Sequence, residues 1–212
     1  MPKIIGESLA SHRELTRTRL FEALGSLMGE QSFESITMSQ IAERAGVGRT
    51  AVYNHFADKE VLLLAYMREV TSEFARVLTQ RLEAEPDPLM RLRIYIRSHL
   101  QMIGRYHVKA GMGLRRQMSG QGASHLHDHA GVVGELLIGI LDEAMERGLI
   151  VEQNTLGAVH LIHATLQGQR LPQDPAHRES ALLLVETFIL RGLGASEENV
   201  CQVTASSLAS GE

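Results

Sequence analysis

The stretch MSQIAERAGVGRTAVYNHF, residues 38–56, constrains the fold more than any other part of the chain. Apolar residues at helical spacing flank a turn that contains Gly46 and Gly48, and a glycine can adopt the left-handed backbone that ends a helix. Thr37 stands three residues before Gln40, which is the spacing of a capping box at a helix start. We therefore predict two short helices joined by a tight turn, the arrangement of a helix-turn-helix. The side chains expected to hold this pair together are Ile41, Ala42, Val47, Val52 and Phe56.

Helical periodicity also dominates the rest of the chain, and no stretch alternates with the period of two that marks a half-buried strand. This pattern predicts an all-α fold. We expect a loosely ordered arm over residues 1–10, a first helix from about Ser11 to Gly29, and a long helix that Asp58 caps. A loop is expected at residues 119–124. Further helices are expected at residues 88–107, 108–118, 127–148, 155–169 and 177–194.

The bulk properties predict a soluble protein of the cytoplasm. The chain has 212 residues, 44% of them hydrophobic, which is enough to bury one or two cores. Its net charge is -4, so binding to a nucleic acid requires a local basic surface. Cys201 is the one cysteine, which excludes an intramolecular disulfide and leaves its role open. We find neither a signal segment nor the ~18 consecutive apolar residues that cross a membrane.

The second short helix is expected to turn a polar face outward. Its exposed residues on this reading are Arg49, Thr50, Tyr53, Asn54 and His55. Such side chains can form hydrogen bonds to base edges and phosphates, and a helix of this size can enter the major groove of DNA.

The segment TMSQIAERAGVGRTAVYNHFADKEVLLLAY, residues 37–66, resembles the DNA-binding segment of the tetracycline-repressor (TetR) family. Gly48 stands where the family usually has a serine, so a phosphate contact from that hydroxyl is missing here. The positions that match the family's pattern are Thr37, Ile41, Ala42, Ala45, Gly46, Val47, Tyr53, His55, Phe56, Lys59 and Leu62.

The resemblance implies roles for the residues around this hairpin. Tyr53 and Lys59 are similar to phosphate contacts of the family, which position a protein on DNA. Thr37 and Ser39 stand where the first short helix would meet a phosphate. His55 is expected to support the hairpin from a half-buried position. The predicted base readers are Arg49, Thr50 and Asn54.

The rest of the chain is expected to serve dimerisation and ligand binding. We predict a DNA-binding domain of three helices at residues 1–57, a larger helical domain at 58–194, and a flexible tail at 195–212. One helix-turn-helix offers too little contact for a specific site, so a homodimer is required. The resemblance implies that the last two helices pair with their copies in a four-helix bundle. The residues predicted for this interface are Val159, Ile162, Leu166, Leu183 and Phe188.

The middle helices are expected to enclose a cavity for a small-molecule effector, as the resemblance implies. The candidate pocket residues are Tyr95, His99, Met102, Met112, Met118 and His163. Methionine suits an adaptable apolar pocket. On this reading the chain is a transcriptional repressor that the effector releases from double-stranded operator DNA.

The histidines of SHLHDH favour an alternative, a metal-responsive regulator. In a helix His125 and His129 share a face while His127 points away, and in an extended segment all three share a side. His160 and His163, three residues apart, could add further nitrogens to a divalent metal. No metal or other cofactor is assigned on this basis. The chain has no G-x-S-x-G, P-loop or G-x-G-x-x-G motif, so an enzyme is not expected, although the hairpin could bind a protein instead of DNA.

Overall fold

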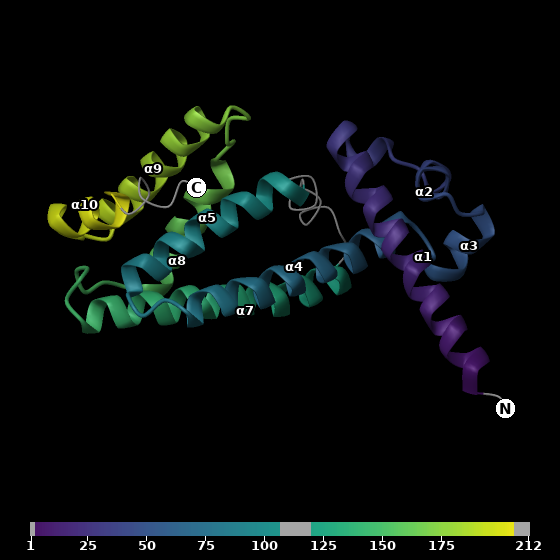
Figure 1. Cartoon of the computed structure of the whole chain (residues 1–212), viewed down its shortest axis with the longest axis horizontal. Helices are drawn as coiled ribbons and strands as arrows, with labels where there is room; N and C mark the ends of the chain where they lie inside the picture. Colours follow the sequence, from purple (N-terminus) through teal and green to yellow (C-terminus); the bar gives the residue numbers. More distant parts are fainter. Residues whose placement is uncertain (1–2, 107–119, 206–212) are drawn as a thin grey trace. The chain divides into compact units, whose positions relative to one another are not determined.

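The computed structural model describes the backbone of residues 3–106 and 120–205, and the side chains of residues 11–102 and 133–205. Every regular element in these ranges is helical (Figure 1), which confirms the all-α fold class. The elements are α1 (Lys3–Glu30), the 3-10 helix η1 (Phe33–Ser35), α2 (Met38–Ala45), α3 (Arg49–His55), α4 (Lys59–Glu83), α5 (Pro88–Tyr106), α7 (Gly120–Glu146), α8 (Thr155–Gly168), α9 (Pro175–Gly192) and α10 (Glu197–Ala205).

The chain divides into two compact units. The first comprises Met1–Val70 and Tyr106–Leu126, and the second comprises Thr71–Arg105 and His127–Glu212. Helix α4 contributes to both units, so the division falls inside this helix. The domain boundary expected after residue 57 stays a prediction.

Local signals in the sequence fix the hairpin of the first unit. The Gln40 backbone N–H donates to the Thr37 hydroxyl at 3.2 Å, and the Thr37 N–H donates to the Gln40 side chain at 2.8 Å. This capping box starts α2, as predicted. Gly46 ends the helix with a φ of 65°, a left-handed conformation that strains any residue with a Cβ atom. Contacts between residues close in the sequence therefore fix this turn.

One apolar core holds the first unit together. Leu20 and Leu24 of α1, Ile41 of α2, Val52 of α3 and Leu62 of α4 are all 0% exposed and belong to one cluster. The hairpin is also fixed at its surface, because the Arg44 guanidinium forms hydrogen bonds of 2.7 and 2.8 Å with the Glu30 carboxylate of α1.

The second unit has a separate core and a buried ion cluster. Glu186 of α9 is 0% exposed, yet it contacts two guanidinium groups of α5. Arg93 Nε lies 3.3 Å from its carboxylate, and Arg97 Nε forms a short hydrogen bond to it. Arg97 also forms hydrogen bonds of 2.6 and 3.0 Å with Glu179, which lies about two helical turns before Glu186 in α9. Burial raises the pKa of Glu186, and the hydrogen bond from Arg97 opposes this rise.

Three segments differ from their predictions. Residues 3–10 belong to α1 instead of a loose arm, since Gly6 is their one weak helix former. Residues 120–124 belong to α7 instead of a loop, because the two glycines there weaken a helix without forbidding it.

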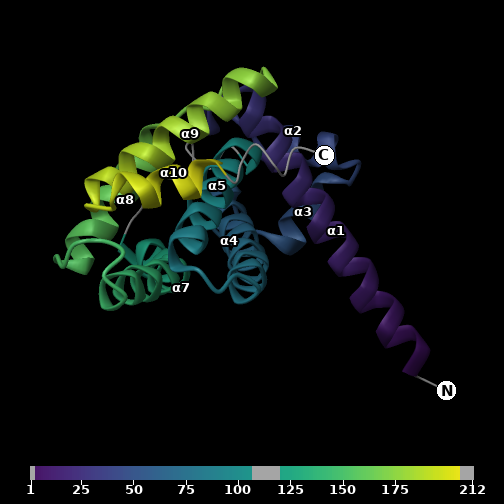
Figure 2. The ribbon, with the colours of Figure 1, turned by 60° about the vertical axis from the view of Figure 1, so that its left-hand side comes forward.

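The expected tail at residues 195–212 was wrong for 197–205, which form α10 beside α9 (Figures 1 and 2). Ser196 caps this helix, because its hydroxyl accepts the Asn199 N–H at 3.2 Å. Val200 and Val203 lie three residues apart and are each 3% exposed in the core of the second unit. Because the rest of this segment is polar, its composition did not indicate that these two valines are buried.

Candidate functional site

Helix α3 presents a polar face to solvent and an apolar face to the core. Arg49, Thr50 and Asn54 are exposed, and Tyr53 is 58% exposed, whereas Val52 is fully buried. Because the capped turn and the core fix the helix, its outward side chains are held on a rigid support. They can donate and accept hydrogen bonds in a groove of DNA.

His55 lies at the edge of this face. It is half-buried, with its ring centroid 6.2 Å from that of Phe56. Burial lowers the pKa of His55, and the charge of Arg13 lowers it further. A neutral, half-buried imidazole fits the supporting role predicted for it. Thr37 is exposed and Ser39 half-buried at the start of α2, and their contacts to DNA stay predictions.

Lys59 was expected to contact a phosphate, and the structure gives it another role. Its ammonium donates to the backbone carbonyls of Phe33 at 3.1 Å, Glu34 at 2.8 Å and Ile36 at 3.0 Å. It also lies 4.9 Å from the ring centroid of Phe33. An ammonium has three N–H donors, so these carbonyls use all of them. Lys59 therefore ties the start of α4 to the segment that precedes α2.

We expect Lys59→Met to lower the free energy of unfolding by about 2 kcal/mol, because it keeps the aliphatic stem but removes the donors to three carbonyls. Urea unfolding followed by circular dichroism measures this change. Lys59→Arg should not restore stability fully, since a planar guanidinium cannot converge on three carbonyls as an ammonium does. A Met variant as stable as the wild type would show that the three bonds contribute nothing.

Three of the predicted pocket residues meet in the second unit. The Tyr95 hydroxyl and His163 Nε2 are 2.7 Å apart, and the ring of His99 stacks with both, at centroid distances of 5.8 Å to Tyr95 and 5.5 Å to His163. Phe74 of α4 contacts His99 edge-to-face at 6.0 Å. We call Phe74, Tyr95, His99 and His163 the ring cluster. Met102, also predicted for the pocket, is 9% exposed.

Burial, together with the smaller effect of the neighbouring His163, lowers the pKa of His99 from 6.5 to about 4. Between these two pH values the unfolded chain binds a proton at His99 that the folded chain does not. Stability therefore falls as the pH drops from about 6.5 to about 4, by roughly 3 kcal/mol at most. Above pH 6.5 this contribution is fully present.

We expect His99→Phe to flatten this part of the stability profile, measured by urea unfolding at pH 7.5, 6, 5 and 4.5. A smaller loss of stability should remain in the variant, because burial also lowers the pKa of His163. An equal loss of stability in the variant and the wild type would contradict the assignment to His99.

Comparisons with known proteins show which family the N-terminal part of the chain resembles. Residues 20–66 match the N-terminal model of the bacterial regulatory proteins of the tetR family, and this match spans α2, α3 and the flanking parts of α1 and α4. The HTH-type transcriptional regulator BetI of Escherichia coli is 34% identical over 94 residues, which are 44% of this chain and 45% of that protein. The N-terminal part of the chain is therefore similar to that of TetR-family regulators.

Solved structures extend the likeness in fold to most of this chain. A tetR-family regulatory protein from Rhodococcus superposes with a TM-score of 0.74 at 19% identity, covering 86% of this chain and 98% of that one. AibR, solved in complex with isovaleryl coenzyme A and operator DNA, gives 0.64 at 18% identity, covering 80% and 97%. The curated relatives are named as transcriptional regulators. The chain spans less than half the length of the curated relatives it matches.

The chain exposes a different face of its last two long helices, α8 and α9, than predicted. Val159, Ile162 and Leu166 are 6%, 3% and 0% exposed, so they belong to the chain's own core and not to a surface. Leu183 is half-buried. Phe188, the remaining predicted interface residue, is 63% exposed. The large apolar side chains that α8 and α9 do expose are Leu156, Leu161, Leu184 and Phe188.

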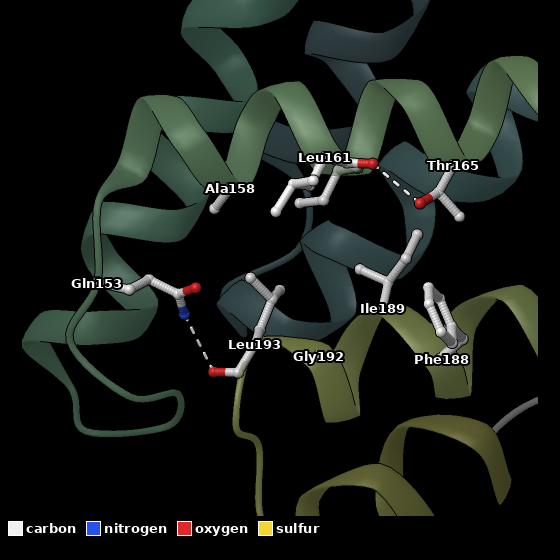
Figure 3. Close-up of a pocket in the computed structure, with 9 residues that line it drawn as sticks. Gln153, Ala158, Leu161, Thr165, Phe188, Ile189, Gly192 and Leu193 are labelled. Atoms are coloured by element: carbon white, nitrogen blue, oxygen red, sulfur yellow. Dashed lines mark hydrogen bonds between the residues drawn. The ribbon is translucent and has the colours of Figure 1, made fainter.

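A groove of about 210 Å³ lies between α8 and α9 on this exposed face (Figure 3). Leu161 and Thr165 line it from α8, and Phe188 and Ile189 line it from α9. Leu161 and Phe188 line this groove, and Leu184 lies one turn before Phe188 on α9. These three exposed side chains and the groove, together called the α8–α9 face, form an apolar surface that a second protein surface could cover.

The remaining candidate residues lie outside the described part of the chain. Met112 and Met118 fall between the described ranges, and the side chains of His125, His127 and His129 are not described although their backbone is part of α7. Among the described residues, no group of three histidine, cysteine or acidic side chains could hold a metal ion. None of the described helices is both long and apolar enough to cross a membrane.

Proposed function

We propose that the chain is a sequence-specific DNA-binding transcriptional regulator, and that it is a repressor which a small molecule releases from its operator. The observation that carries this proposal is the exposed polar face of α3 on a hairpin that a capping box, a left-handed glycine and a buried core hold rigid. The regulator names of its relatives support it. We place the protein in the cytoplasm, where its operator would be.

Binding to fragmented genomic DNA tests the proposal. The purified chain is mixed with the fragments at low salt, and the retained DNA is sequenced. We expect enrichment of a few fragments over the rest, because specific sites bind about 10³-fold or more above non-specific DNA. Uniform retention, or none, would contradict specific recognition and would favour the alternative in which the hairpin binds a protein.

We further propose that the regulator works as a homodimer through the α8–α9 face. Leu161, Leu184 and Phe188 are large apolar side chains that are costly to leave in water, and a second copy can cover them with the same surface. A two-fold dimer would also supply the second helix-turn-helix that a specific DNA site needs.

We expect Leu161→Glu combined with Phe188→Glu to make the protein monomeric, because each change would bury a carboxylate in the interface. Sedimentation velocity measures the mass. Val61→Glu, at an exposed apolar position of α4, is the matched control and should stay dimeric. A monomeric wild type, or a double variant that stays dimeric, would contradict this interface.

The effector cannot be taken from the relatives, because proteins of this fold bind different molecules. AibR was solved with isovaleryl coenzyme A, and RolR, with a TM-score of 0.56, was solved with resorcinol. We propose that the effector binds the second unit and acts only through its different affinity for the two states of the protein. Helix α4 contributes to both units, so we propose that it carries the signal. We propose no cofactor, and metal-responsive regulation through the histidines at 125–129 stays a prediction.

A further inference from the structure

The ring cluster contains a buried imidazole without a hydrogen-bonding partner. His99 is 7% exposed, and neither Nδ1 nor Nε2 has a partner among the residues that the structure describes. Its contacts in this part of the chain are with the rings of Phe74, Tyr95 and His163. An edge-to-face contact is much weaker than a hydrogen bond, so it does not compensate for two unpaired polar atoms. Buried polar groups of this kind call for an explanation.

The neighbouring pair shows how a hydroxyl and an imidazole fit together in this environment. The Tyr95 hydroxyl lies 2.7 Å from His163 Nε2, and the two rings are within 24° of parallel. His99 stacks against the same two rings at interplanar angles of 25° and 21°, but lacks a hydroxyl of its own. A second aromatic hydroxyl would supply His99 with a hydrogen bond like the one that Tyr95 forms with His163. Because a hydroxyl both donates and accepts, it suits either tautomer of a neutral imidazole.

The surroundings favour an uncharged ligand. Neither an ion pair nor a hydrogen bond joins the ring cluster to a charged side chain within the described ranges, so an anion would lose its hydration without gaining a counterion. His99 itself is a neutral group at physiological pH, since burial holds its pKa near 4. Its contacts among the described residues are aromatic rings, and the buried Met102 stands one turn further along α5.

We infer that His99, beside the Tyr95–His163 pair, recognises the hydroxyl group of an uncharged aromatic effector, that is, a phenol. The inference rests on the proposed function, because it names the chemical class of the effector. In the complex the phenol hydroxyl forms a hydrogen bond with one ring nitrogen of His99, and the aromatic part of the effector packs against the apolar side chains around the ring cluster.

Calorimetric titration of the full chain with phenol, toluene and benzoate tests this inference. The three probes share a benzene ring and differ in carrying a hydroxyl, a methyl or a carboxylate. We expect phenol to bind at least about tenfold more tightly than toluene, which lacks the hydrogen-bonding group, and benzoate to bind more weakly than phenol. His99→Phe should remove the preference for phenol over toluene. His160→Gln, an exposed histidine of the same helix as His163, is the matched control and should keep it.

Equal affinity for phenol and toluene in the wild type, tighter binding of benzoate, or no binding of phenol would each overturn the inference. The wild-type comparison decides the matter even where His99→Phe folds poorly. Genomic-fragment binding is measured on the same samples. A wild type that binds specific DNA but not phenol refutes the inference alone, whereas a wild type that binds no specific DNA refutes the proposed function.

Discussion

Arg49→Ala combined with Tyr53→Ala is expected to abolish specific DNA binding without unfolding the protein. Both side chains are exposed on α3 and contribute nothing to the core of the first unit, so their loss should leave the melting temperature almost unchanged. An arginine that reads a base and a tyrosine that contacts a phosphate each contribute roughly 1–3 kcal/mol. Together they should weaken binding to a selected fragment by about 100-fold or more.

Fluorescence anisotropy on a labelled fragment measures this loss. Arg68→Ala removes one positive charge from an exposed position of α4 outside the hairpin, so it controls for net charge and should bind almost as well as the wild type. The single variants separate the two roles. Arg49→Ala should relax sequence preference, whereas Tyr53→Ala should weaken binding to all sequences. A double variant with wild-type affinity would show that α3 does not read DNA.

Glu186→Ala is expected to produce the largest loss of stability among the changes considered. The carboxylate is fully buried between Arg93 and Arg97, and the Arg93 side chain is only 9% exposed. Removal of the carboxylate leaves a buried guanidinium without its counterion. Loss of one partner of a buried pair costs about 3–5 kcal/mol. That is a large fraction of the stability of a typical domain.

Urea unfolding followed by circular dichroism measures this effect. Glu197→Ala is the matched control, since Glu197 pairs with Arg191 at the surface of the same unit and its loss should change stability little. Glu186→Gln keeps the shape and one acceptor oxygen, so it should lie between the two. A Glu186→Ala protein as stable as the Glu197→Ala protein would show that the cluster does not hold α9 to α5.

The hairpin of the first unit could be predicted because its signals are local. The capping box at Thr37, the left-handed Gly46 and the cap at Asp58 act within three or four residues of where they stand, and all three are present. The role of Lys59 could not be predicted in this way. Its partners lie 23 to 26 residues earlier in the chain, and no periodicity reports such a contact.

The second unit was harder to predict because its helices are apolar on more than one side. In α8 the predicted interface residues Val159, Ile162 and Leu166 follow the spacing of a buried stripe, and that stripe faces the chain's own core. Leu161 lies off this stripe and is 72% exposed, so it was the better signal for the surface that we propose a second copy covers. A glutamate within ALLLVETFIL was a similar overlooked sign, because a charge inside an apolar run needs a buried partner.

The ring cluster was predicted only in part. His99 stands beside an apolar stripe of its helix, so its burial could be predicted. The rings that contact it could not, because they come from three different helices. Phe74 of α4 was missed for this reason, since residues that are distant in sequence share a site only after the helices pack.

Methylation protection on a selected genomic fragment tests the central claim most directly, because dimethyl sulfate attacks guanine N7 in the major groove where α3 is proposed to lie. The account predicts two protected patches related by two-fold symmetry, about 34–36 Å apart along the duplex, with two protein chains bound. A single patch with one bound chain, or an unprotected major groove at saturating protein, would contradict it.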